Sequence, residues 1–193
     1  MPDRHTPNWP DIWFLRHGQT EWNLAGRIQG RLDSDLTALG RAQAQQQAGL
    51  MSDIAQRVTS CGGCIHVSPL GRARQTAALA LPGRALTIDA RLAEVATGLW
   101  EGLLKADLPQ GETDLDTYTS APGGEDLETL IARVRSFADD LVTPSIVVAH
   151  GMLGQVLRGL AQGINPDKMG AQDNGQGCVY YLSSGHETRL DKF

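Results

Sequence analysis

The chain has 193 residues, and its 41% hydrophobic and 20% charged residues are ordinary proportions for a globular protein. They exclude collagen-like and wholly disordered chains, and the length suits a single domain, residues 1–193, with its own core. The formal net charge of −5 has the wrong sign for binding nucleic acid or an anionic membrane through the overall field, so neither is expected as a partner.

The N-terminal segment and the cysteines bear on the compartment. Residues 1–11 carry three Pro and no apolar stretch, so we expect a short arm rather than a secretory signal. No apolar run in the chain approaches the ~20 residues needed to span a bilayer. The three Cys are odd in number and form no disulfide framework, which fits a reducing compartment. We therefore expect a cytoplasmic protein.

Short β-rich runs alternate with helical stretches along the chain. Strands are expected at residues 12–15, 65–67, 85–88, 146–149, 179–182 and 188–190, and helices at 37–54, from Ser68-Pro69 onward, at 127–141 and at 153–160. Ser68 is the expected N-cap of the second helix, with Pro69 in its first turn. The stretch from residue 91 to about 124 is less regular. This alternation predicts an α/β domain with a mainly parallel sheet.

A histidine follows each of two continuous apolar runs. His17 and His150 stand where two buried strands should end, and each precedes a Gly. In parallel sheets, ligands bind beyond the carboxyl ends of the strands. Arg16 stands beside His17, and Arg72 falls in the first turn of a predicted helix, where free backbone N–H groups favour an anion. These side chains together indicate a phosphate pocket.

The basic residues agree with an anion site, because 14 of them are Arg and only 3 are Lys. Arg grips a phosphate through two parallel hydrogen bonds and stabilises the charge on a transferred phosphoryl group. A neutral His nitrogen is nucleophilic near neutral pH without a separate base, so this chemistry requires no metal. Glu94 is the best-placed acid for the leaving oxygen.

Residues 15–23, Leu-Arg-His-Gly-Gln-Thr-Glu-Trp-Asn, resemble the signature of the histidine phosphatase superfamily, also called the phosphoglycerate mutase-like family. Further blocks match in order, at Gln29-Gly30 with Asp33, Leu36-Thr37, Ser68-Pro69-Leu70 with Arg72-Ala73, Glu94, Gly98–Gly102, Pro122–Glu125 and Val148–Gly151. They cover about residues 12 to 154. The resemblance implies a three-layer α/β/α sandwich with a mainly parallel central sheet.

The resemblance also implies a role for each matching residue. His17 would be the phosphorylated nucleophile, Arg16, Arg72 and His150 would bind the phosphoryl group, and Glu94 would act first as acid and later as base. The substrate side would be formed by Asn23, Arg27, Gln29, Gly30 and Gly151. Residues from about 95 to 124 would form an insertion that covers the active site. No cofactor and no metal is implied.

The segment after Glu94 helps to separate a phosphatase from a mutase. Mutases of this family carry extra basic residues there to hold a highly charged phosphoglycerate. Residues 95–132 contain one basic residue, Lys105, and eight acidic ones, namely Glu101, Asp107, Glu112, Asp114, Asp116, Glu125, Asp126 and Glu128. Such a cover should repel a polyanion. We therefore expect hydrolysis of a small-molecule phosphomonoester with few other charges.

Alternative functions remain open from the sequence. The pocket could transfer its phosphoryl group to a second hydroxyl, as a mutase does, or bind phosphate without turnover. Cys61 and Cys64, with His66, have a spacing also used by zinc and thiol redox sites. Arg74, Arg133 and Arg135 are expected on solvated helix faces, and residues 172–175 in a turn that could border the pocket.

Overall fold

The computed structural model describes residues 6–191. The first part of the predicted arm, residues 1–5, lies outside the described residues. Within residues 6–191, no helix is long and apolar enough to cross a membrane.

One mixed sheet of six strands forms the centre of the fold. The strands are β1 (Ile12–Arg16), β2 (Cys64–Val67), β3 (Thr87–Ile88), β4 (Ser145–Ala149), β5 (Val179–Ser183) and β6 (His186–Leu190), in the spatial order β3-β2-β4-β1-β5-β6. The first four run parallel, whereas β5 and β6 pair antiparallel to their neighbours. Every residue of β4 is buried, as its continuous apolar character predicts for a strand covered on both faces.

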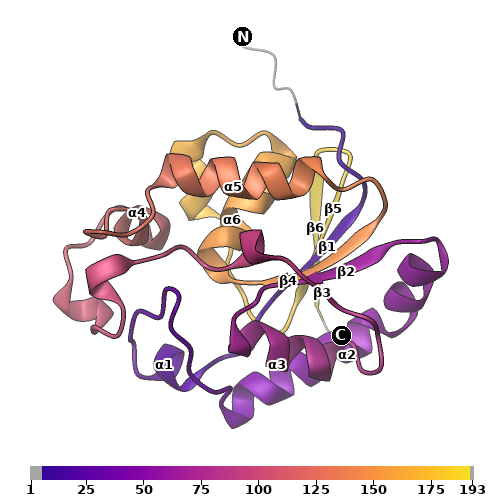
Figure 1. Ribbon diagram of the computed structural model, residues 1–193, viewed down its shortest axis with the longest axis horizontal. Coiled ribbons are helices and arrows are strands. Elements are labelled where there is room, and N and C mark those ends of the chain that lie inside the picture. The colour runs from indigo at the N-terminus through magenta and orange to yellow at the C-terminus, as the bar shows by residue number, and fades with distance from the viewer. Residues whose placement is uncertain (1–5, 192–193) are drawn as a thin grey trace.

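Helices cover both faces of the sheet (Figure 1). On one face lie α2 (Ala38–Ser60) and α3 (Gly71–Ala80), and on the other lie α5 (Leu127–Asp139) and α6 (Gly151–Gln162). Each face has its own apolar core, with Met51, Ile65 and Val148 in one and Phe14, Phe137 and Leu157 in the other. The predicted three-layer α/β/α architecture is confirmed.

Helix α6 lies unusually close to the sheet because a glycine faces β1. A Cβ atom built at Gly154 would lie 2.3 Å from Cζ of Phe14, so only Gly permits this approach. The helix is almost entirely buried and ends at Gly163, whose φ of 66° is the left-handed conformation typical of a helix C-cap. The close packing sets the N-terminus of α6 beside the end of β1.

Two local predictions are wrong. Ser68 is not the N-cap of α3, because the N-cap is Leu70 and the helix begins at Gly71. The expected strand at 85–88 is confined to Thr87–Ile88.

The stretch from 91 to 124 is less regular, as expected. It contains one short α-helix, α4 (Asp114–Thr119), whose six residues are too few for a visible apolar repeat.

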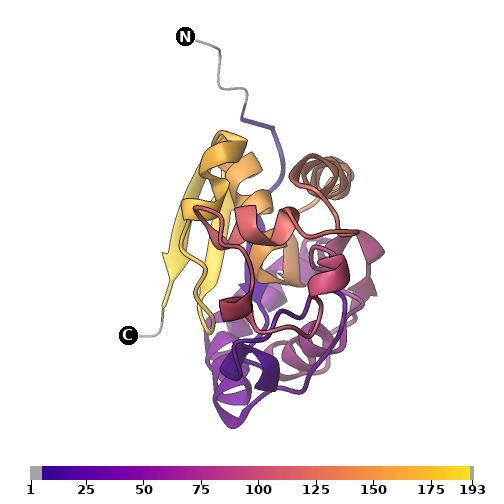
Figure 2. The same cartoon turned by 90° about the vertical axis from the view of Figure 1, so that its left-hand side faces the viewer.

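The end of the molecule at which β1 and β4 finish is built from segments far apart in the sequence. Helix α1 (Glu21–Leu24), α4 and the chain between about residues 95 and 120 lie together there (Figure 1). Figure 2 looks onto this end, and the pink chain around α4 crosses it between the yellow C-terminal strands and α1.

Candidate active site

A polar cavity of about 300 Å³ lies at this end of the sheet. It is lined by Arg16, His17, Asn23, Arg27, Gln29, Gly30, Arg72, Glu94, Asp114, Tyr118, Met152 and Asn174. Eight of the ten predicted site residues are among them. The other two, His150 and Gly151, lie at the start of α6, and His150 is fully buried with its ring centroid 5.2 Å from that of His17.

A larger cavity of about 420 Å³ lies elsewhere, beside the starts of β1 and β4. Its lining is mainly apolar and includes Trp13, Ile54, Val58 and Tyr181. None of the predicted site residues contributes to it. The polar cavity is therefore the one that matches the sequence-based site.

His17 follows the last residue of β1, and a hydrogen bond determines which of its ring nitrogens carries the proton. Its Nδ1 lies 2.8 Å from the carbonyl oxygen of Gly18, and because a carbonyl only accepts, Nδ1 carries the proton. The Nε2 atom is then unprotonated and keeps its lone pair. Burial lowers the pKa of His17 well below 6.5, and the nearby Arg72 and Arg16 lower it further. The ring is thus a neutral imidazole with a free nucleophilic nitrogen.

The turn after β1 that contains His17 and Gly18 packs directly against the backbone of α2 at Gly40. A Cβ atom at Gly18 would lie 2.2 Å from the carbonyl oxygen of Gly40 in the first turn of α2, so this position requires Gly. The Gly18 N–H donates to the hydroxyl of Thr76 in α3 at 3.1 Å. Two helices of one layer therefore fix the position of the imidazole.

Arg72 is buried and tightly oriented. Its guanidinium donates to the carbonyl oxygens of Leu32 and Gly30 and to the carboxylate of Asp33, at 2.7, 2.9 and 2.9 Å. The Nε atom of Arg72 is buried and has no hydrogen-bond partner among the described residues. A bound oxyanion would satisfy such a donor.

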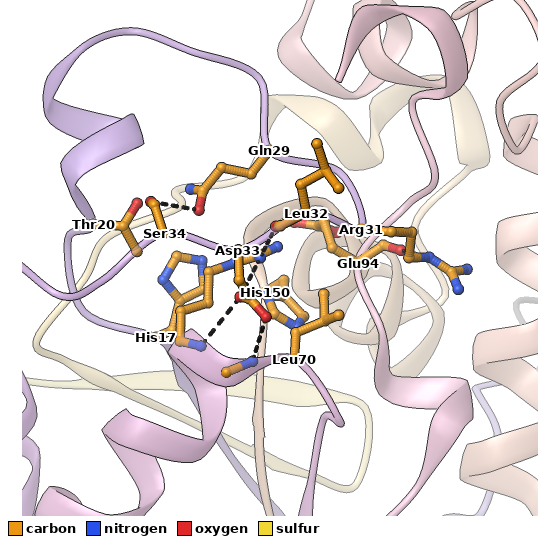
Figure 3. Close-up of polar contacts among 12 residues, drawn as sticks. His17, Thr20, Gln29, Arg31, Leu32, Asp33, Ser34, Leu70, Glu94 and His150 are labelled. Atoms are coloured by element: carbon orange, nitrogen blue, oxygen red, sulfur yellow. Dashed lines mark hydrogen bonds and ion pairs between the residues drawn. The ribbon is translucent and has the colours of Figure 1, made fainter. Parts of the chain in front are cut away.

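Asp33 caps α3 across a distance of 38 residues (Figure 3). Its carboxylate accepts from the backbone N–H groups of Gly71 and Arg72 at 2.6 and 3.2 Å, and also binds the Arg72 side chain. One carboxylate thus stabilises the helix N-terminus and orients the guanidinium. The motif comparison included Asp33 but assigned it no role.

We expect Asp33→Ala to lower the free energy of unfolding by about 1 kcal/mol, as loss of a helix cap does. Because Arg72 also loses a partner, activity should fall roughly tenfold, the effect of about 1.4 kcal/mol in the transition state. Urea unfolding and phosphatase assays would measure both. Asp35→Ala is the matched control, since Asp35 lies in the same loop and contacts the side chain of Gln75. Equal effects of the two changes would contradict the role of Asp33.

Arg16 is oriented from the opposite side of the cavity. Its Nη1 donates to the carbonyl oxygen of Asn174, and its Nε is buried without a partner among the described residues. Gln176 in the same loop donates to the carbonyl oxygen of His17 at 2.9 Å. The predicted turn at 172–175 therefore borders the cavity.

Two buried side chains hold that loop in place. Arg158 donates to the carbonyl oxygen of Asp173 at 2.5 Å, and its guanidinium lies 3.7 Å from the ring centroid of Tyr180. The Tyr180 hydroxyl donates to the Asp173 carboxylate and accepts from the Gly175 N–H, at 2.6 and 2.7 Å. The position of Asn174, and through it that of Arg16, depends on this network.

His150 forms the buried back of the site. Its Nε2 lies 2.6 Å from the hydroxyl of Ser68, whereas its Nδ1 is buried without a partner among the described residues. Burial lowers the pKa of His150 well below 6.5, and Arg72, His17 and Arg16 add to the effect. Ser68, predicted to cap a helix, instead orients this imidazole.

The two lowered histidine pKa values predict acid sensitivity of the fold. Below pH 6.5 the unfolded state protonates rings that stay neutral in the folded state, so the free energy of unfolding should fall with pH. The limiting slope is about 1.4 kcal/mol per pH unit for each ring, down to its folded pKa. Urea unfolding between about pH 5 and 7 would show a shallower slope for His17→Asn than for the wild type. Identical slopes would contradict the prediction.

Glu94 lies against the N-terminus of α6. Its carboxylate accepts from the backbone N–H groups of Val95, Met152 and Leu153 at 3.0, 3.1 and 3.0 Å. The preceding chain is held by Arg133, which donates to the carbonyl oxygens of Arg91 and Ala93 and pairs with Glu125. The prediction that Arg133 is solvated is therefore wrong, because two carbonyl oxygens and the Glu125 carboxylate bind its guanidinium and its side chain is only 16% exposed. Arg74 and Arg135 are exposed as predicted.

Four of the five predicted substrate-side residues line the cavity, namely Asn23, Arg27, Gln29 and Gly30, whereas Gly151 does not. Asn23 is the third residue of α1, where its side chain accepts from the Thr20 N–H in a capping box. Arg27 donates to the carbonyl oxygen of Gly102 at 2.7 Å, and Gln29 accepts from the hydroxyl of Ser34 at 3.1 Å (Figure 3). Arg27 and Gln29 thus tie the 27–34 loop to its surroundings.

Helix α4 adds two side chains that are not among the predicted site residues. Asp114 and Tyr118 lie one turn apart and both line the cavity. Asp114 pairs with Lys105, with 2.5 Å between carboxylate and ammonium. Burial, and then the charges of Asp114 and Glu94, raise the pKa of Tyr118 to about 12, so its hydroxyl keeps its proton. The sequence predicts Asp114 only as one of the acidic residues of the expected cover, and it contains no signal for Tyr118.

The cysteine and histidine cluster does not form a metal site in the described part of the chain. Cys61 and Cys64 are exposed free thiols, and the ring of His66 packs edge-on against Phe137. Within residues 6–191, no three His, Cys, Asp or Glu side chains are grouped to hold a metal ion. The zinc hypothesis therefore lacks a ligand set there.

Comparison with known proteins agrees with this geometry. The model of the histidine phosphatase superfamily (branch 1) matches residues 12–190. The chain is 37% identical to a probable phosphoglycerate mutase GpmB of Serratia proteamaculans over 73% of its length and 69% of the relative's. It is 32% identical to a glucosyl-3-phosphoglycerate phosphatase of Mycolicibacterium vanbaalenii over 92% of its length and 85% of the relative's.

A solved structure extends the likeness to three dimensions. It is that of a mycobacterial glucosyl-3-phosphoglycerate phosphatase in complex with VO3, with a TM-score of 0.76, 29% identity, and coverage of 95% of this chain and 97% of the other. The matching motifs, the fold and the position of the cavity agree with the family named from the sequence. The chain belongs to the histidine phosphatase superfamily, branch 1.

Proposed function

We propose that the protein hydrolyses a small-molecule phosphomonoester through a phosphohistidine at His17. The observation that carries this proposal is the free Nε2 of a neutral His17 in the same cavity as two oriented guanidinium groups. In the first step, Nε2 attacks phosphorus and the ester oxygen leaves. Glu94 supplies the proton that this oxygen takes.

The phosphoryl oxygens are held during the transfer by Arg16 and Arg72, with His150 behind them. Both arginines are pre-oriented by carbonyl oxygens and Asp33, so their charge is in place before the reaction. In the second step, Glu94 accepts a proton from water, whose oxygen attacks the phosphohistidine. The N–P bond breaks, inorganic phosphate leaves and His17 is restored.

The charged residues of the segment 95–132 favour hydrolysis of the phosphoryl group over its transfer to a second hydroxyl, as in a mutase. The one basic residue between 95 and 132 is Lys105, and its ammonium is paired with Asp114. A bisphosphate would therefore find no unpaired basic side chain in this segment. We infer that residues 95–124 act as a cover over the site, and that the reaction takes place in the cytoplasm, where the exposed Cys61 and Cys64 stay reduced.

The test is turnover of p-nitrophenyl phosphate by the wild-type protein in the presence of EDTA. Quenching turnover with alkaline detergent should also trap a phosphoprotein that is stable in base and labile in acid, as an N–P bond is. Hydrolysis that needs a divalent metal, or turnover without a phosphoprotein, would contradict the mechanism. Faster transfer to 3-phosphoglycerate than to water would establish a mutase instead.

A further inference from the structure

The part of the cavity lining formed by α4 contains an ion pair, Asp114 with Lys105, rather than a free cation. Asp114 lines the cavity, and its side chain is 49% exposed, so the carboxylate is open to solvent and substrate. Lys105, from a different segment, binds it at 2.5 Å. The pair leaves no unopposed positive charge at this part of the wall.

One phosphoryl group balances the positive charge of the cavity lining. The proposed first step requires a protonated Glu94, so the charged lining groups are the guanidinium groups of Arg16, Arg27 and Arg72 and the carboxylate of Asp114, a balance of +2 with neutral histidines. A dianionic phosphate brings this balance to zero. A second anionic group on the substrate would then find no excess of positive charge, and it would be repelled most by Asp114.

Neutral hydroxyl groups suit the same wall. The Asp114 carboxylate accepts hydrogen bonds, and Tyr118 presents a protonated hydroxyl one helical turn away. Loss of a hydrogen bond to a charged acceptor is costly, so a hydroxylated leaving group is preferred to one that lacks hydroxyls.

We propose that Asp114, held by Lys105, is a specificity-determining residue that selects phosphomonoesters of neutral polyhydroxy alcohols and rejects those that carry a second anion near the phosphate. The inference rests on the proposed phosphatase function and names its substrate class. It assigns to α4 a role in choosing the substrate, separate from the transfer of the phosphoryl group.

A matched pair of compounds tests the charge directly. Glycerol 3-phosphate and 3-phosphoglycerate share one carbon skeleton, and differ in a hydroxymethyl group against a carboxylate. Their inhibition constants against p-nitrophenyl phosphate hydrolysis can be measured whether or not either is turned over. The wild-type protein should bind glycerol 3-phosphate more tightly. Asp114→Asn should shift the ratio of the two constants toward 3-phosphoglycerate about tenfold, the effect of ~1.4 kcal/mol of removed repulsion.

Two further variants separate a local effect from a general one. Asp107→Asn removes the same charge from an exposed residue outside the cavity lining, and it should leave the ratio unchanged. In the Asp114→Asn variant the Lys105 ammonium is unpaired and helps to bind the carboxylate of 3-phosphoglycerate. Adding Lys105→Met should therefore cancel part of the shift toward 3-phosphoglycerate. A circular dichroism melt would verify that α4 and the rest of the fold survive each change.

Each outcome has one meaning. An equal shift in the Asp107 and Asp114 variants, an unchanged ratio in the Asp114 variant, or tighter binding of 3-phosphoglycerate by the wild type would overturn the inference and leave the phosphatase function intact. Absence of p-nitrophenyl phosphate hydrolysis by the wild type would instead refute the proposed function.

Discussion

Replacement of His17 by Asn is expected to lower kcat for p-nitrophenyl phosphate by about 10⁴-fold or more, since it removes the proposed nucleophile on which every later step of the proposed mechanism depends. The trapped phosphoprotein should disappear with it. Binding of inorganic phosphate should survive, because the partners of Arg16 and Arg72, the carbonyl oxygens of Asn174 and Leu32, do not involve His17.

The control for this variant is His186→Asn. His186 is exposed on β6 and does not line the cavity, so its replacement should leave both turnover and the phosphoprotein unchanged. Isothermal titration with inorganic phosphate would verify that the His17 variant is folded and keeps its anion site. Residual phosphoprotein in the His17 variant would place the nucleophile elsewhere, with His150 as the next residue to examine.

Replacement of Arg72 by Ala is expected to reduce kcat/KM by at least about 10²-fold to 10³-fold, the cost of one pre-oriented donor to transferred charge. Stability should fall as well, by roughly 1–3 kcal/mol for a carbonyl oxygen left buried without a donor. The oxygen affected in this way is that of Gly30, whereas the Leu32 oxygen lies in an exposed residue and can bind water. Phosphatase assays and urea unfolding would measure the two losses separately.

Arg72→Lys distinguishes charge from geometry. Lys keeps the positive charge but cannot reach Leu32, Gly30 and Asp33 with a planar fork, so most of the catalytic loss should remain. Arg74→Ala is the matched control, because Arg74 lies two residues further along α3 and is exposed. Full activity of the Lys variant would show that only charge matters at this position.

Several parts of the fold could be predicted from the sequence because their signals are local. Continuous apolar runs predict β1 and β4, since strands covered on both faces contain no alternation. The apolar stripe from Leu127 to Phe137 predicts α5, since a surface helix repeats about every 3.6 residues. Both histidines were found because each one stands directly after its strand.

Other features could not be predicted because they join residues distant in the sequence. The cap of α3 comes from Asp33, 38 residues before it, rather than from the adjacent Ser68. The helical pattern predicts a solvated Arg133, but the carbonyl oxygens of Arg91 and Ala93 accept hydrogen bonds from its guanidinium. The residue pattern within one helix or strand does not predict a hydrogen-bond partner from a distant segment.

The sequence by itself determined the order of strands and helices, the family and the residues expected to carry out the chemistry. Only the tertiary structure decided which nitrogen of His17 is free, what orients Arg72, and that Asp114 faces the cavity with Lys105 bound to it. The physical reason is the separation along the chain over which each feature is determined. Backbone periodicity and motifs can be recognised within a few consecutive residues. Hydrogen bonds, burial and charge in the site act between segments that meet only when the sheet and its helices are assembled.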